Sequence, residues 1–126
     1  MKKITILTLL LCIIPLIAIG NEIPAPFAKA KELALKATPN AEGNYLLVFE
    51  GSDASYYFYL LGYIPGKQII GVGKLESKDV IVAEYHEATK EFSFWVNGYR
   101  YMDVDKTRVI EFAFKVFREL VARKLI

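Results

Sequence analysis

Residues 55–75, SYYFYLLGYIPGKQIIGVGKL, decide the fold of this 126-residue chain. Two runs rich in aromatic and branched residues surround Pro65-Gly66, and both runs have the composition of β-strands. A connection this short can join only antiparallel strands. The stretch therefore predicts a β-hairpin, and the Pro-Gly pair predicts a type II turn with a positive φ at Gly66.

The first strand of this hairpin is apolar on both of its faces. Successive residues of a strand point to opposite faces of the sheet. One face receives Tyr57, Tyr59, Leu61 and Tyr63, and the other receives Tyr56, Phe58, Leu60 and Gly62. We expect Phe58 and Leu60 to pack in the core and the tyrosines to line the opposite face, where their hydroxyls stay hydrated. A register shift of one residue would exchange the two faces.

Further strands are expected on both sides of the hairpin. Between Tyr45 and Asp103 the chain reads as short β-type runs separated by turn residues: NYLLVFE, ASYYFYLLGYI, QIIGVGKL, DVIVAEYH, FSFWV and YRYMD. Asn97-Gly98 is a strong signal for a two-residue turn, and it predicts three facing pairs, Val96 with Tyr99, Trp95 with Arg100 and Phe94 with Tyr101. The Arg100 guanidinium would then lie over the Trp95 ring. These signals predict a curved antiparallel meander of five to six strands.

One helix is expected before the meander and one after it. Residues 24–38 place Phe27, Ala30, Ala34 and Ala37 on one stripe, so this helix can lie close against another element. Residues 105–124 form a longer amphipathic helix, with Asp103 or Asp105 as N-cap. Its apolar arc spans about 200°, which is wider than a flat sheet requires. The predicted fold class is α+β, with the C-terminal helix packed on the sheet.

The N-terminus has the pattern of a secretory signal peptide, residues 1–20. Lys2 and Lys3 precede an apolar run at 4–20 that ends in small residues. A run of this length is short for a membrane-spanning helix, which needs about 20 residues, although an uncleaved anchor is the alternative. We expect cleavage, export to a periplasm or the exterior, and a single mature domain, residues 21–126. Cys12 is the only cysteine, so the mature chain would form no internal disulfide.

The charge balance argues against polyanionic partners. The chain has 16 Lys plus Arg and 14 Asp plus Glu, and two of the lysines lie in the predicted signal peptide. The mature domain would therefore carry 14 charges of each sign. A neutral domain without a basic cluster does not suit nucleic acid or an anionic lipid surface.

The sequence contains no pattern typical of an enzyme or of a metal site. His86 is the only histidine, and Glu84 would share its face of a strand. None of the serines lies in a nucleophile-elbow context, and GVGKL lacks the spacing of a phosphate-binding loop. One histidine without a mature cysteine does not favour a transition metal. We therefore expect no catalytic residues, no cofactor and no metal.

The surplus of aromatic surface leaves three hypotheses for function. Tyrosine and tryptophan are enriched at protein interfaces, which favours a binding or inhibitor/immunity-type protein that contacts a protein partner. The candidate contact residues are Tyr57, Tyr59, Tyr63, Trp95 and Arg100. One alternative is a carrier that holds a small apolar ligand between the sheet and the C-terminal helix. The other is a homodimer that buries the aromatic face.

Overall fold

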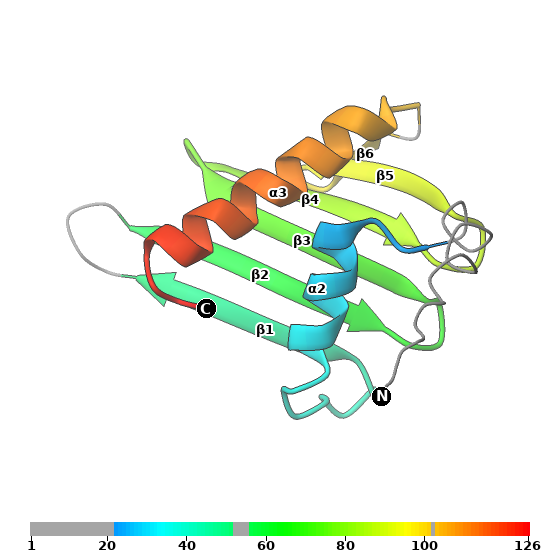
Figure 1. Cartoon of the computed structure of the whole chain (residues 1–126), viewed down its shortest axis with the longest axis horizontal. Helices are drawn as coiled ribbons and strands as arrows, with labels where there is room; N and C mark the ends of the chain where they lie inside the picture. Colours follow the sequence, from blue (N-terminus) through cyan, green and yellow to red (C-terminus); the bar gives the residue numbers. More distant parts are fainter. Residues whose placement is uncertain (1–21, 52–55, 102) are drawn as a thin grey trace, which may run out of the picture.

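The described part of the chain folds as two helices on one six-stranded antiparallel sheet, which confirms the predicted α+β class (Figure 1). The computed structural model describes residues 22–51, 56–101 and 103–126, so the predicted signal peptide lies outside the described residues. The elements are α2 (Ala25–Ala34), β1 (Tyr45–Gly51), β2 (Tyr57–Ile64), β3 (Ile69–Glu76), β4 (Asp79–His86), β5 (Glu91–Val96), β6 (Tyr99–Tyr101) and α3 (Lys106–Ala122).

The strands lie side by side in chain order, as expected for a meander. The turn between β5 and β6 has φ of 51° at Asn97 and 86° at Gly98, the left-handed conformation that a two-residue hairpin requires. All three predicted pairs across this turn are confirmed. The Arg100 guanidinium lies 5.6 Å from the centre of the Trp95 ring, as predicted.

The predicted type II turn at Pro65-Gly66 is wrong. The positive φ in this loop lies at Gln68 (52°) and not at Gly66. The Lys67 amide donates to the Ile64 carbonyl and the Gln68 amide donates to the Pro65 carbonyl, both at 3.2 Å. The chain therefore continues through two overlapping turns, and the left-handed residue comes at the point where it enters β3.

Both helices cover the same side of the sheet (Figure 1). In α2 the predicted stripe is buried at Phe27, Ala30 and Ala34, all fully enclosed. The helix ends earlier than the predicted residue 38, because the Lys36 and Ala37 amides bond to carbonyls three residues back and tighten the last turn. In α3 the Asp105 carboxylate accepts the Thr107 amide at 3.0 Å, which confirms one of the two predicted N-caps.

The structure reverses the predicted assignment of faces in β2. Tyr59 is 3% exposed and Leu61 is fully buried beneath the helices, so the expectation that Phe58 and Leu60 fill the core is wrong. The neighbouring strand β3 supplies the reason. One of its faces carries Ile70 and Val72, which can fill space against a helix, whereas the other carries two glycines, which cannot.

Candidate functional site: the open face of the sheet

Neither of the two described helices, α2 and α3, covers the other face of the sheet (Figure 1). Alternation along the strands places these apolar residues there: Leu46, Val48, Phe58, Leu60, Ile64, Ile69, Leu75, Val80, Val82 and Trp95. We call this surface the open face. Leu46 is 53% exposed and Val80 is 39% exposed. The solvent side of an antiparallel sheet is ordinarily polar, and a broad exposed apolar surface marks a site of interaction.

A groove lies on the open face where two glycines meet. Gly62 and Gly71 face each other directly across β2 and β3. They form the floor of a groove of about 240 Å³, which Leu46 and Glu84 flank on the adjoining strands. A Cβ added at either glycine would meet its nearest atoms at 3.5 Å or more, which is ordinary van der Waals contact, so neither position is blocked by its neighbours. The groove can accept a side chain of a bound partner.

The third glycine of this face has a different role. A Cβ at Gly73 would lie 3.0 Å from a methyl of Val82 and 3.2 Å from Cγ of Leu60. These two side chains already cover the glycine, which is why no hollow forms there. The groove is therefore local to the Gly62–Gly71 pair.

A polar cluster lies beside the groove on β4 and β5. The Ser93 hydroxyl donates to Oε1 of Glu84 at 2.9 Å, and Nε2 of His86 lies 2.9 Å from the same hydroxyl oxygen. Since the hydroxyl proton is directed at Glu84, the imidazole must donate to Ser93 rather than accept from it. A serine nucleophile requires the opposite direction of proton transfer. Ser93 is also fully buried, so the cluster does not have the geometry of a catalytic triad.

The five residues predicted to bind a partner do not form one surface. Trp95 and Arg100 face each other on the open face. The Trp95 indole N–H is buried and has no hydrogen-bond partner among the described residues. An unpaired buried donor is costly to the stability of the fold.

The three predicted tyrosines lie instead on the helix side. Tyr57 and Tyr63 pack at the margin of the core and Tyr59 lies within it. The Lys31 ammonium group lies 4.7 Å from the centre of the Tyr63 ring. The prediction that these tyrosines form an exposed binding face is therefore wrong. The reason lies in β3, because its glycines lie on the open face and the helices cover the face that carries Ile70 and Val72.

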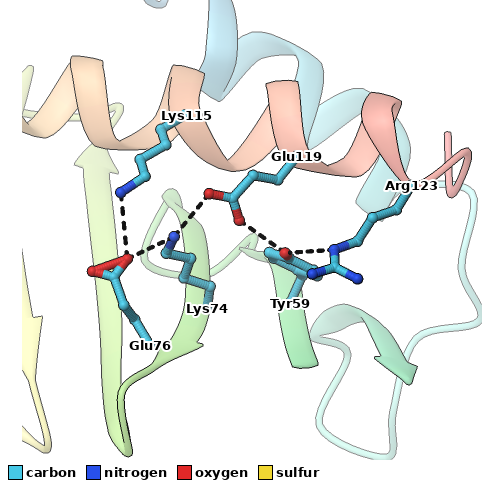
Figure 2. Close-up of polar contacts among 6 residues, drawn as sticks. All are labelled: Tyr59, Lys74, Glu76, Lys115, Glu119 and Arg123. Carbon is cyan, nitrogen blue, oxygen red and sulfur yellow. Dashed lines mark hydrogen bonds and ion pairs between the residues drawn. The ribbon is translucent and has the colours of Figure 1, made fainter. Parts of the chain in front are cut away.

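A polar network joins α3 to the sheet on the covered side (Figure 2). The Tyr59 hydroxyl donates to Oε1 of Glu119 at 2.8 Å, and Nε of Arg123 donates to the Tyr59 oxygen at 3.1 Å. The Lys74 ammonium group, 5% exposed, donates to Oε2 of Glu119 at 3.0 Å. It also pairs with Glu76 at 2.7 Å. Each of these buried polar groups has a hydrogen-bond or ion-pair partner, which indicates that the network holds α3 on the sheet.

The pKa values of this network follow from those contacts. Burial alone would lower the pKa of Lys74, but its bonds to Glu76 and Glu119 outweigh burial and raise it. Burial would raise the pKa of Glu119, but the bonds from Lys74 and Tyr59 lower it. Burial, together with the bond to Glu119, raises the pKa of Tyr59. Each group is therefore held in its ordinary charge state at neutral pH.

A second hollow lies on the helix side, where α3 begins. It has a volume of about 520 Å³ and lies between the start of α3 and strands β5 and β6. Phe94, Val96 and Val109 supply apolar walls, and Asp103 and Arg108 lie among its charged lining residues. This hollow therefore lies between the sheet and the start of the C-terminal helix.

The chain matches no family model, no curated protein and no solved structure. Within residues 22–51, 56–101 and 103–126, no helix has the length and apolar character to cross a membrane. The same residues contain no group of three or more His, Cys, Asp or Glu side chains placed to hold a metal ion. What the protein does must therefore be inferred from its own surfaces.

Sequence reasoning overlooked most of the open face. Leu46, Val48, Val80 and the Gly62–Gly71 pair were not among the expected contact residues. The sequence did contain a signal for this face. Gly62 lies in one strand of the hairpin and Gly71 and Gly73 lie in the next, and strand alternation places all three glycines on the same face when the two strands pair. A face with several glycines offers little side-chain volume for packing against a helix.

Proposed function

We propose that this protein is a small exported, non-enzymatic binding protein that contacts a protein partner through the open face. The observation that carries the proposal is the complete, mainly aliphatic sheet face that neither α2 nor α3 covers. Export is proposed from the signal-peptide pattern at residues 1–20. An inhibitor or immunity-type role fits a domain whose cluster of Glu84, His86 and Ser93 on this face lacks catalytic geometry.

Physical features of the open face support a protein partner over a polyanion. Its groove is apolar apart from Glu84 and two asparagines at its margin. Trp95 faces the groove residue Val82 across β4 and β5, and Arg100 lies beyond it on β6. Both residue types are frequent anchors at protein interfaces. The expected neutral charge of the mature domain adds no long-range attraction for nucleic acid.

Substituting Val80→Lys is expected to reduce recovery of the partner at least tenfold. A lysine there would place a hydrated charge on the apolar surface of the contact. The measurement is quantitative mass spectrometry of proteins captured by the purified chain from its native source. Val121→Lys is the matched control, because Val121 is also exposed (58%) but lies on α3, away from the open face. Equal capture by wild type and Val80→Lys would refute a role for this face.

The hollow at the start of α3 supports a second candidate function, carriage of a small apolar ligand. Its volume lies in the range of small-molecule sites. Val96→Trp should fill the hollow and reduce uptake of a hydrophobic fluorescent dye at least fivefold, while Val80→Trp on the open face should leave uptake unchanged. Native mass spectrometry should also show a co-purified ligand with the wild type. A clean apo mass with no dye uptake would eliminate this candidate.

A further inference from the structure

The two edge strands of the sheet, β1 and β6, differ in how well they are protected against pairing with another strand. Edge strands expose unpaired backbone groups, and proteins guard them with short length, charges, proline or bulges. The β6 edge is only Tyr99–Tyr101 and carries Arg100 at its centre. The β1 edge runs from Tyr45 to Gly51 without proline, lysine or arginine, and its pairing with β2 is continuous and free of bulges.

No described residue pairs through its backbone with the outer side of β1. Among the residues that the structure describes, β2 is the only strand paired with β1, and no turn or loop bonds to its main chain. Leu46 and Val48 project from this strand onto the open face and are 53% and 38% exposed. The edge therefore combines unpaired N–H and C=O groups with exposed aliphatic side chains, which is the pattern of a strand that recruits another strand.

We propose that β1 pairs antiparallel with β1 of a second copy of this chain, about a two-fold axis at Leu47. This register sets Leu46 opposite the partner's Val48 on the open face. On the helix side it sets Tyr45 opposite the partner's Phe49. Every such pair is apolar, and cross-strand pairs of this kind stabilise a sheet.

The position of Glu50 disfavours registers in which the axis lies further along β1. Shifting the axis from Leu47 to Val48 would place Glu50 opposite the partner's Leu46, and shifting it to Phe49 would place Glu50 opposite the partner's Val48. Both shifts set a charge against an aliphatic side chain. With the axis at Leu47, Glu50 lies beyond the apolar pairs, opposite the partner's Asn44. The strand is thus complementary to itself, which favours a second copy over an unrelated peptide.

The dimer joins two open faces into one continuous surface. A two-fold axis perpendicular to the sheet keeps like faces on the same side, so each copy's groove stays accessible. This inference does not rest on the proposed function, because the β1 edge would pair whether or not the open face binds a further protein.

Two double variants test the pairing through the Leu46–Val48 contact. In Leu46→Lys/Val48→Lys each lysine at 46 faces a lysine at 48 of the partner, and like charges directly opposite destabilise a strand pair. In Leu46→Lys/Val48→Glu the same positions form two opposite-charge pairs. Sedimentation equilibrium over a range of concentrations measures the association constant, and circular dichroism verifies that each variant is folded.

The wild type is expected to reach twice the mass of one chain as concentration rises. The Lys/Lys variant should associate at least about tenfold more weakly, and the Lys/Glu variant should recover most of that loss. A wild type that stays monomeric at every concentration would overturn the proposal. Equal association of the two double variants would overturn it as well, because the shifted registers do not pair position 46 with position 48.

Discussion

Replacing Leu61 by alanine is expected to lower the free energy of unfolding by about 2–5 kcal/mol. Leu61 is fully buried in the core cluster, where it lies on the side of β2 that faces the helices. Alanine would remove most of the buried side chain and leave a cavity that the surrounding residues fill only in part. Urea or guanidinium denaturation followed by circular dichroism measures the loss as a lower midpoint at unchanged slope.

Leu46→Ala is the matched control for this substitution. Both residues are leucines in adjacent strands, but Leu46 lies on the open face and is 53% exposed. Its truncation should cost less than about 1 kcal/mol in the isolated chain. A smaller loss for Leu61→Ala than for Leu46→Ala would mean that the helices cover the other face, and the open face would then be misassigned.

Replacing Glu119 by alanine is expected to cost about 2–3 kcal/mol at neutral pH, since hydrogen bonds to charged groups contribute about 1.5–3 kcal/mol. The change removes the acceptor of the Tyr59 hydroxyl and one of the two carboxylates that pair with the buried Lys74 ammonium group (Figure 2). Breaking one side of a buried pair leaves its partner desolvated without full compensation. Glu111→Ala is the control, because Glu111 is an exposed glutamate of the same helix and should cost less than about 0.5 kcal/mol.

The pH dependence of this loss identifies the carboxylate as its source. The pKa of Glu119 is lowered in the folded protein from the reference value of 4.5. Its contribution to stability is therefore present above pH 4.5 and disappears as the pH falls through the lower, folded pKa. The difference between wild type and Glu119→Ala should shrink in that acid range. A difference that stays constant down to the acid limit would assign the loss to packing alone.

At alkaline pH, the free energy of unfolding is expected to fall because Lys74 loses its charge. Its pKa is raised in the folded protein from 10.5, so its contribution is complete below 10.5 and is lost as the pH rises through the folded pKa. Wild-type stability should therefore show a broad maximum between these two limits. The same series of denaturation curves covers both limbs.

Local features of the fold were predictable from the sequence. The Asn97-Gly98 turn and the facing of Trp95 and Arg100 depend on residues that are close in the chain. The same holds for the buried stripe of α2 and for the Asp105 cap of α3. Each of these follows from a short-range rule of backbone conformation or periodicity, so neighbouring residues suffice to specify it.

The candidate site was predictable only in part. Trp95 and Arg100 lie on the open face, but the three tyrosines proposed beside them lie on the other. In a strand that is apolar on both faces, the alternation of side chains shows which residues share a face. It does not show which of the two faces packs against a helix. The groove was beyond prediction, because it exists only where Gly62 and Gly71 meet across two strands.

The sequence by itself determined the order of elements, the antiparallel meander and two sets of alternating residues in each strand. Only the tertiary structure decided which set lies under the helices. That choice depends on the combined volume that several paired strands present to a helix, and Ile70 and Val72 offer volume where Gly71 and Gly73 do not. Lys74 shares the covered face because α3 provides Glu119 as a partner for its charge. The aliphatic face left open is a result of that packing.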